Sequence, residues 1–168
     1  AKSVNNVKGD ISFEEVGFRY QSTGESVLEH LNFSIEAGKN IAIVGPSGVG
    51  KTTICNLIPR FYDVTEGAIY LDGTNIKELK VQDLRQNIGI VQQDVYLFSG
   101  TVFENIEYGK PGASLKEIER AAKLAGAYEF IDALPEKFNT YIGERGTKLS
   151  GGQKQRISIA RVFLKNPP

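Results

Sequence analysis

The residues best suited to chemistry in this chain lie in one short stretch, Gly45-Pro46-Ser47-Gly48-Val49-Gly50-Lys51-Thr52. The stretch matches the pattern G-x-x-x-x-G-K-[ST], whose glycines let the backbone turn tightly and point N–H groups at an anion. Lys51 would reach the β- and γ-phosphates of a nucleoside triphosphate. Thr52 would offer its hydroxyl to Mg²⁺, a cation that prefers oxygen ligands. The pattern therefore predicts a phosphate-binding loop with a magnesium ion beside it.

The segments on both sides of the loop must hold it in place. Residues 40–44 (Asn-Ile-Ala-Ile-Val) predict a buried strand, and residues 51–60 predict a helix. The positive end of that helix's dipole would lie at the loop and add to the attraction for phosphate. A chance glycine-rich turn is the alternative interpretation, and the order of strand, loop and helix disfavours it.

β-Structure is predicted for most of the first half of the chain. Residues 11–13 and 16–20 both alternate between apolar and polar side chains, but the two sets are out of phase. A bulge or bend at Glu14-Glu15 would bring them into one strand. Residues 31–35 also alternate, and Asp72-Gly73 is a strong signal for a hairpin turn.

The hydrophobic pattern changes in the second half. A last short apolar strand is predicted at residues 88–91, and beyond residue 93 the period becomes helical. Ser114 and Glu117 fit a capping box, which predicts that a helix begins there. The final helix is predicted from Ser150 toward Leu164. Its expected inner stripe consists of Ile157, Ala160 and Leu164.

Composition limits the possible functions. The chain has 168 residues, which suggests one domain with a real core. Its 20 basic residues balance its 20 acidic ones, so we expect no nucleic acid as a partner. No apolar run approaches the roughly 20 residues that span a bilayer. The single cysteine, Cys55, cannot form an internal disulfide, and we expect it to be a buried small side chain on the helix after the loop.

A second motif, Leu149-Ser150-Gly151-Gly152-Gln153, stands where the last helix is expected to begin. A hydroxyl and free N–H groups at a helix N-terminus suit a phosphate, although such residues alone more often form an ordinary N-cap. With the phosphate-binding loop about 100 residues upstream, the motif resembles the signature of the ATP-binding cassette (ABC) family of transporter ATPases. The resemblance runs from about Gly9 to Pro168, and residues 98–106 look most similar to multidrug and lipid exporters.

The resemblance implies an α/β fold of the P-loop NTPase type, with a RecA-like core, an antiparallel β subdomain and an inserted helical signature subdomain. Residues 1–10 would be a linker from a membrane domain, 11–93 a β-rich nucleotide core, 94–155 the helical subdomain, and 156–168 a return toward the core. In the family, two further core strands, the Mg²⁺-binding aspartate, the catalytic glutamate and the switch histidine follow the position of Pro168. We therefore expect a fold that is incomplete at the C-terminus, a polypeptide that continues, and a fragment that alone neither folds cooperatively nor hydrolyses ATP.

Several single residues match positions of the family. Tyr20 would stack on adenine, unless it is an ordinary tyrosine of the core. Gln93, or less readily Gln92, would contact Mg²⁺ and the attacking water. Glu144, just before the signature, would face the membrane domain, unless it forms a solvated charge pair with Arg145.

The resemblance thus assigns catalytic roles to Lys51 and Gln93 and metal-binding roles to Thr52 and Gln93. The signature residues would bind the nucleotide of a second nucleotide-binding domain in a head-to-tail dimer. The nucleotide-binding residues that it implies are Tyr20, Gly45, Pro46, Ser47, Gly48, Val49, Gly50, Lys51, Thr52, Thr53, Ser150, Gly151, Gly152 and Gln153.

For the whole protein, the resemblance implies ATP and Mg²⁺ as cofactors, a transmembrane domain as partner and a place at the cytoplasmic face of the cell membrane. The exported substrate would be a drug, a lipid or a peptide. Three alternatives remain: a soluble ABC-type ATPase of DNA repair or translation, a P-loop kinase or GTPase, and a catalytically silent nucleotide sensor. The exporter-like segment around Glu144 disfavours the first, and the signature has no place in the second.

Overall fold

The alternating segments of the first half form one antiparallel sheet. The computed structural model describes residues 1–4, 6–143 and 148–168, and its strands are ordered β2-β1-β3-β4. The strands are β1 (Ile11–Arg19), β2 (Ser26–Ile35), β3 (Glu66–Leu71) and the short β4 (Thr74–Asn75). Strand β1 pairs with both β2 and β3, so it forms the centre of the sheet.

The predicted bulge in β1 is confirmed. The register of β1 against β2 shifts between Phe13 and Val16, and its register against β3 shifts between Glu14 and Gly17. Glu15, at the centre of the bulge, has a φ of 47°. The extra residue lets Phe13 and Val16 both point into the core, although an unbroken strand would place them on opposite faces.

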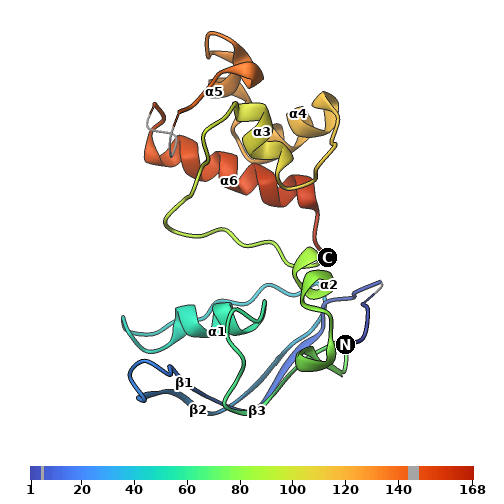
Figure 1. The fold of residues 1–168 in the computed structure, drawn as a ribbon, viewed down its shortest axis with the longest axis vertical. Helices are drawn as coiled ribbons and strands as arrows, with labels where there is room; N and C mark the ends of the chain where they lie inside the picture. Colours follow the sequence, from blue (N-terminus) through green and yellow to red (C-terminus); the bar gives the residue numbers. More distant parts are fainter. Residues whose placement is uncertain (5, 144–147) are drawn as a thin grey trace. The chain divides into compact units, whose positions relative to one another are not determined.

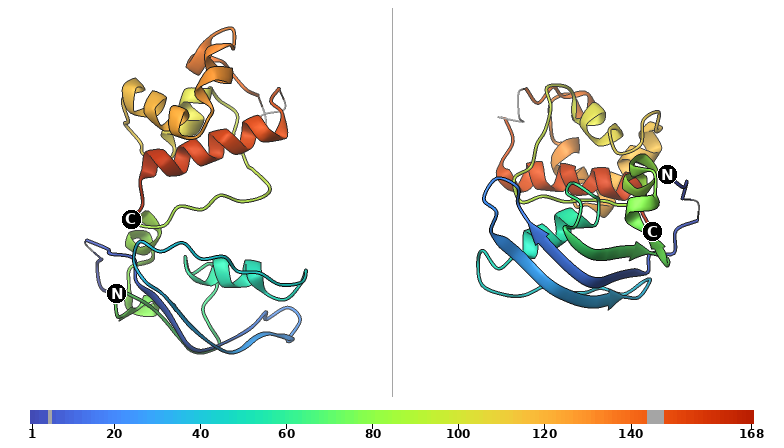
Figure 2. Two further views of the ribbon diagram at one scale, coloured as in Figure 1. Left: turned by 180° about the vertical axis from the view of Figure 1, so that it is seen from behind. Right: turned by 60° about the horizontal axis from the view of Figure 1, so that its bottom comes forward.

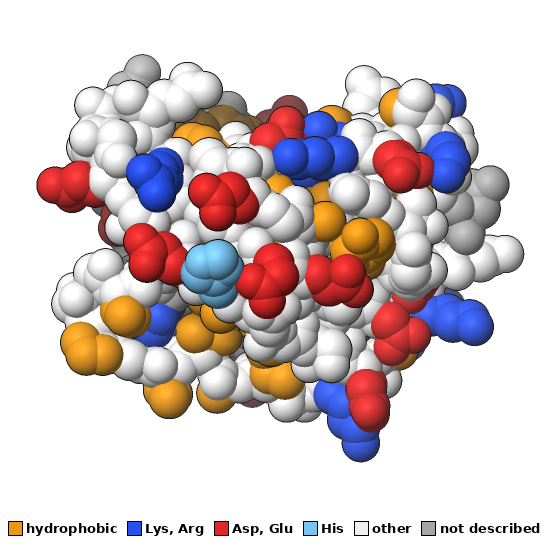
Figure 3. Space-filling model, turned by 90° about the horizontal axis from the view of Figure 1, so that it is seen from below, with side chains coloured by type: hydrophobic (Ala, Val, Ile, Leu, Met, Phe, Trp, Pro, Cys, Tyr) orange, Lys and Arg blue, Asp and Glu red, His pale blue; other side chains and the backbone are white. Residues whose placement is uncertain are grey.

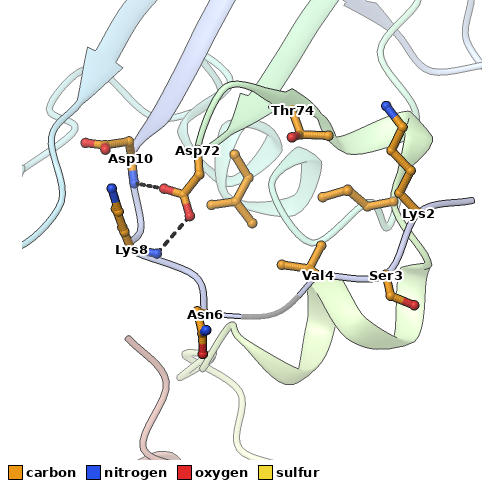
Figure 4. A pocket seen from close by; sticks show the side chains of 10 residues that line it. Lys2, Ser3, Val4, Asn6, Lys8, Asp10, Asp72 and Thr74 are labelled. Carbon is orange, nitrogen blue, oxygen red and sulfur yellow. Dashed lines mark hydrogen bonds between the residues drawn. The ribbon is translucent and has the colours of Figure 1, made fainter.

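The hairpin turn between β3 and β4 is also confirmed, and it fastens the N-terminal segment. Asp72 and Gly73 form the turn with φ values of 49° and 77°. The Asp72 carboxylate accepts hydrogen bonds from the backbone N–H groups of Lys8, Gly9 and Asp10 at 2.8, 3.1 and 2.9 Å. Figure 4 shows this carboxylate at the wall of an open cavity between the N-terminal segment and the turn.

The chain divides into two compact units, each with a core of its own. The first unit comprises residues 1–88 with Pro168, and the second comprises residues 89–167. In the first unit, helix α1 (Lys51–Leu57) lies over one face of the sheet, as Figures 1 and 2 show. Its side chains Ile54 and Leu57 belong to the same buried cluster as the inner side chains of β1 and β3. The unit also contains a 3₁₀ helix, η1 (Ile76–Glu78), and helix α2 (Val81–Gln86).

The second unit is helical, as its sequence period predicts. Its elements are α3 (Val102–Glu107), α4 (Leu115–Leu124), α5 (Tyr128–Asp132), the 3₁₀ helix η2 (Lys137–Asn139) and α6 (Gly151–Lys165). Helices α3 and α4 both pack against α6. The predicted inner stripe of α6 is confirmed, because Ile157, Ala160 and Leu164 are all buried. The capping box of Ser114 and Glu117 is confirmed as well.

Two predicted strands are not formed. Residues 40–44 and 88–91 lie outside every strand of the described structure. Most of their apolar side chains are exposed, 50% for Ile41, 87% for Val44 and 43% for Val91, although Ile88 is partly buried against the core of the first unit. An apolar segment becomes a strand only when a neighbour supplies the hydrogen bonds of a ladder. Among the described residues no strand lies beside either segment. The prediction of a buried strand at 40–44 was therefore wrong for this structure.

The prediction for Cys55 was also wrong, because its side chain is exposed. Helix α1 turns Thr53, Ile54 and Leu57 toward the sheet. Successive helical residues are about 100° apart around the axis, so Cys55 is directed away from that face. The helix is also shorter than predicted, since it ends at Leu57 and Arg60 has a φ of 54°.

No helix within the described residues has both the length and the apolar character of a membrane span.

Candidate functional site

The phosphate-binding loop has the backbone that its glycines predict. Gly48 and Gly50 have φ values of 83° and 98°, in the left-handed region where a side chain is strained. Gly50 is buried, and a Cβ built there would lie 2.9 Å from Cδ2 of Leu28, so packing excludes a side chain as well. The loop from Gly45 to Val49 is exposed and therefore open to a ligand.

Helix α1 begins at the loop without a side-chain cap. Gly50 is its N-cap and has no side chain that could accept a hydrogen bond from the first turn. The N–H groups of a helical first turn have no acceptor within the helix, so an anion can take that place. Thr52 is exposed in the same turn and could offer its hydroxyl to a cation.

Lys51 folds back over its own loop. Its Nζ donates hydrogen bonds to the backbone oxygens of Gly45, at 2.7 Å, and Pro46, at 2.5 Å. The ammonium group therefore lies over the backbone turn, where the sequence pattern places the β- and γ-phosphates. These carbonyl oxygens accept the Nζ hydrogen bonds that phosphate oxygens would accept in a complex.

These features fit a nucleoside triphosphate with Mg²⁺. The glycine turn, the uncapped helix start and the lysine supply donors and positive charge for the phosphates. Mg²⁺ keeps several waters and binds phosphate oxygens, so it needs only one or two protein ligands. Among the described residues there is no group of three or more His, Cys, Asp or Glu side chains that could hold a metal ion. The exposed hydroxyl of Thr52 fits the role of one such ligand.

Tyr20 lies directly after β1 and is half-buried. Its ring makes edge contacts with Phe18, at 4.7 Å between ring centroids, and with Tyr62, at 5.2 Å. Its hydroxyl lies 3.1 Å from Oγ1 of Thr53. Tyr20 therefore packs at the edge of the core while part of it stays open to solvent, so it combines features of both interpretations made from the sequence.

The side chain of Thr53 is directed at Tyr20. Thr53 is only 5% exposed, and the bond to the tyrosine hydroxyl gives its buried oxygen a partner. The sequence pattern gave no sign of this link, because the two residues are 33 positions apart. Tyr62 was missed for the same reason: its contact with Tyr20 depends on where α1 ends above the sheet.

In the second unit, the signature forms the start of α6. Ser150 is the N-cap, and its Oγ accepts a hydrogen bond from the backbone N–H of Gln153 at 3.2 Å. The side-chain oxygen of Gln153 accepts in return from the backbone N–H of Ser150 at 3.0 Å. The hydroxyl of Ser150 uses only its oxygen in this box, so its proton can still be donated to a further acceptor.

The signature box differs from two others in the same unit by being uncharged. Helix α3 is capped by Thr101 with Glu104, and helix α4 by Ser114 with Glu117. The α6 box has the neutral Gln153 in place of the glutamate. A carboxylate favours an isolated helix N-terminus, but it would repel a phosphate that approached the same end. The neutral box therefore leaves this helix end suitable for an anion.

Gly151 and Gly152 keep the surface beside this box open. Both are exposed, and a Cβ built on either would meet no atom within 4 Å. Both glycines stand in the first turn of α6, and no contact within the described residues requires the lack of a side chain there. The surface beside the box is therefore open to close approach by a ligand.

For the remaining predicted site residues, the described part of the structure gives no contacts that bear on their roles. Gln92 and Gln93 are exposed in the second unit. Glu144 and Arg145 lie outside the described residues, so the predicted contact with a membrane domain has no structural counterpart here. Lys51 belongs to the first unit and Ser150 to the second.

An arginine that the sequence did not single out anchors the loop after Gln93. Arg161 of α6 donates hydrogen bonds to the backbone oxygens of Asn105, at 2.5 Å, and Tyr96, at 2.8 Å. It also donates to Oδ1 of Asn105 at 2.7 Å, and its guanidinium lies 4.8 Å from the ring centroid of Phe98. Burial lowers the pKa of Arg161. The signature helix thereby holds the segment that follows Gln93.

Comparison with known proteins decides the family. A model of the family described as "ABC transporter" matches residues 28–168. The chain belongs to the ABC transporter family. This membership confirms the P-loop NTPase fold expected from the phosphate-binding loop and the signature.

Relatives of this ABC transporter chain are named for export. The Bacillus subtilis protein YgaD, provisionally named a multidrug export ATP-binding/permease protein, is 52% identical over 168 residues, which are 100% of this chain and 29% of that protein. A Staphylococcus aureus protein with the same kind of name is 53% identical over 100% of this chain and 29% of its own length. The structure of a bacterial Atm1-family ABC exporter with ATP bound has a TM-score of 0.92 and 46% identity, covering 99% of this chain and 30% of that one.

Proposed function

We propose that this chain is the nucleotide-binding domain of an ABC exporter and that it binds ATP with Mg²⁺. The observation that carries the proposal is the position of the Lys51 ammonium, 2.7 Å from the Gly45 oxygen and above a glycine turn at an uncapped helix start. Lys51 would bind the β- and γ-phosphates, and Thr52 would bind the metal ion. Tyr20 would stack on adenine, and Gln93 would contact Mg²⁺ and orient the attacking water.

A second part of the proposal concerns the signature. Ser150, Gly151, Gly152 and Gln153 would bind the triphosphate held by a second nucleotide-binding domain in a head-to-tail dimer. The open surface at Gly151 and Gly152 and the neutral capping box support this role. Bound in this way, the γ-phosphate would join the two domains, and its hydrolysis would release them.

The partners and the location of the whole protein are proposed from its relatives. The chain spans about 29% of the length of the curated relatives, whose names combine ATP binding with a permease. We therefore place the chain at the cytoplasmic face of the cell membrane, joined to a transmembrane domain that exports a drug, a lipid or a peptide. The export names favour this assignment over an ATPase of DNA repair or translation.

The test of nucleotide binding is the substitution Lys51→Ala in the full-length protein. Loss of a charge-assisted hydrogen bond costs roughly 1.5–3 kcal/mol, so ATP affinity should fall about tenfold or more. Titration with a fluorescent ATP analogue measures the dissociation constant. Lys39→Ala, which removes an exposed lysine outside the loop, is the control and should leave the affinity unchanged. Equal affinities for the Lys51→Ala and wild-type proteins would refute the phosphate site.

The test of the signature is Gln153→Glu. A glutamate can still accept the hydrogen bond from the N–H of Ser150, so the helix cap and the fold should survive. The added negative charge should repel the partner's triphosphate and abolish ATP-dependent dimerisation, measured by sedimentation with ATP and with ADP. The control is Glu117→Gln, the reverse exchange in the box of α4, which should leave dimerisation intact. A Gln153→Glu protein that still dimerises with ATP would place the anion site elsewhere.

A further inference from the structure

Tyr20 is held at two ends by different elements of the first unit. Its backbone directly follows β1. Its carbonyl oxygen accepts hydrogen bonds from the backbone N–H groups of Thr23, at 3.3 Å, and Gly24, at 2.9 Å, which close a turn. Its hydroxyl at the far end of the ring is joined to Thr53 of α1 at 3.1 Å. The ring therefore connects the central strand with the helix that begins at the phosphate-binding loop.

The helix end of this connection lies close to the phosphate-binding loop. Thr53 is two residues after Lys51 in α1, which is about 3 Å along a helix axis. Thr53 is 5% exposed, so its Oγ1 has a fixed position in the core. One hydrogen bond thus sets the position of the aromatic ring relative to the lysine that is proposed to bind the phosphates.

Tyr62 restricts the same ring from the side. Its centroid lies 5.2 Å from that of Tyr20 at an interplanar angle of 87°, and Phe18 packs at 4.7 Å with an angle of 86°. Edge contacts of this kind favour one ring orientation over others. The Tyr20 ring is consequently restrained in tilt by two aromatic neighbours and in position by Thr53.

We propose that Thr53 and Tyr62 are positioning residues that hold Tyr20 at a fixed distance and tilt from the phosphate-binding loop, so that base and triphosphate are bound together. The inference rests on the proposed nucleotide site. In it, the Thr53 side chain contacts Tyr20, the residue proposed to stack on adenine, and does not contact the nucleotide directly. The inference also makes a specific prediction for Tyr20→Phe. Stacking alone would let phenylalanine replace tyrosine, whereas the connection to Thr53 requires the hydroxyl.

The experiment compares two ligands of the full-length protein: Mg·ATP, which has a base, and Mg·tripolyphosphate, which has none. Thr53→Val removes the hydrogen bond with little change of shape. It should weaken ATP binding about threefold to tenfold, the scale of one hydrogen bond, and change tripolyphosphate binding less than about twofold. Thr53→Ser keeps the hydroxyl and should restore the wild-type ratio of the two dissociation constants. Tyr62→Ala should lower the preference for ATP, and Tyr62→Phe should not.

Tyr20→Phe removes the same hydrogen bond by changing its other partner. Because this substitution leaves the buried side of α1 unchanged, it can replace Thr53→Val if that variant does not fold. The double variant Tyr20→Phe with Thr53→Val should lose no more preference for ATP than either single variant, because one bond is removed in all three. Equal weakening of both ligands, an unchanged ratio or additive losses would each overturn the inference.

Failure of the nucleotide site itself would look different. In that case Lys51→Ala would leave tripolyphosphate binding unchanged, or Tyr20→Ala would leave the ratio of the two dissociation constants unchanged. If Lys51→Ala and Tyr20→Ala act as expected while Thr53→Val and Tyr20→Phe keep the wild-type ratio, the site stands and only the positioning roles are wrong.

Discussion

At the scale of single residues, the charged capping box of α4 depends on pH. Glu117 accepts a hydrogen bond from Lys110 at 2.6 Å, and it also accepts from the backbone N–H and the hydroxyl of Ser114 at 2.8 and 2.9 Å. These bonds lower the pKa of Glu117 from 4.5 to about 2, with the lysine contributing most. Because the pKa is lowered by folding, the stabilisation is complete above about pH 4.5 and is lost as the pH falls toward 2.

We therefore predict that Glu117→Gln changes the pH dependence of stability in one direction. The amide can still accept from Ser114, but it does not titrate and has no charge to offer Lys110. The difference in unfolding free energy between the wild type and the variant should be largest near neutral pH and should shrink between pH 4.5 and 2. Urea denaturation at several pH values measures it. A difference that stays constant across that range would contradict the prediction.

A second ionisable pair, on the outer face of the sheet, changes stability with pH in the opposite direction. Nδ1 of His30 lies 2.8 Å from a carboxylate oxygen of Glu15, in the bulge of β1. The hydrogen bond to Glu15 raises the pKa of His30, and the nearby charges of Glu66 and Glu29 add to the effect. Figure 3 shows the histidine among acidic side chains on this exposed face. The contribution of the protonated His30 is complete below about pH 6.5, as long as Glu15 is ionised, and it is lost as the pH rises through the raised pKa of His30.

At the scale of elements, the bulge of β1 requires a glycine on the neighbouring strand. Gly67 of β3 has a φ of 68°, and a Cβ built on it would lie 2.2 Å from the backbone oxygen of Glu15 and 2.3 Å from that of Glu14. Those two atoms are backbone, so a side chain at position 67 must move β1 itself. The bulge and the glycine therefore form one structural feature.

We predict that Gly67→Ala is strongly destabilising and that Gly24→Ala is a matched control. Gly24 has a nearly equal φ of 69°, but a Cβ there meets no atom within 4 Å. Gly24→Ala should cost only the strain of a left-handed residue, about 1–2 kcal/mol. Gly67→Ala should cost more by at least about 1 kcal/mol, because backbone must also shift. Urea denaturation of both variants decides it, and equal losses would show that the backbone contact carries no cost.

The elements also show how far the sequence predicts this structure. The hairpin at Asp72, the capping box at Ser114 and the stripe of α6 were predictable because each depends on residues a few positions apart. The lack of a strand at 40–44 was not predictable, because pairing needs a distant neighbour that the hydrophobic pattern of one segment does not reveal.

The same distinction applies to the candidate site. The residues of the phosphate-binding loop and the signature could be named from contiguous motifs. The bond between Tyr20 and Thr53 spans 33 positions, and that between Asn105 and Arg161 spans 56. Their side-chain types occur throughout the sequence, so only the packed fold identifies the pairs.

At the scale of the whole molecule, two apolar segments are exposed in spite of their composition. Ile41, Ile43 and Val44 precede the phosphate-binding loop, and Ile90 and Val91 precede Gln92 and Gln93. Each of these five apolar residues is at least 36% exposed. Exposed apolar surface of this kind reduces the free energy available for folding, which in ordinary domains is only about 5–15 kcal/mol.

We predict that residues 1–168, expressed alone, melt over a broad range and bind a hydrophobic dye. The full-length protein should show a narrower transition for the same region and less dye binding. Differential scanning calorimetry and dye fluorescence measure the two properties. A sharp melt of the isolated fragment with Mg²⁺-dependent ATP turnover would show that these segments need no further covering.

The partly buried guanidinium of Arg161 has a consequence for spectroscopy. Aromatic rings shift the resonances of nearby protons through their ring currents, and the guanidinium carbon lies 4.8 Å from the Phe98 centroid and 5.9 Å from that of Tyr108. Its Nε–H is bonded to the oxygen of Asn105 and should exchange slowly with solvent. In a two-dimensional nitrogen–proton NMR spectrum, this group should therefore give a separate, upfield-shifted signal. That signal would report, during titration with nucleotide or with a partner domain, whether the segment after Gln93 remains attached to the signature helix.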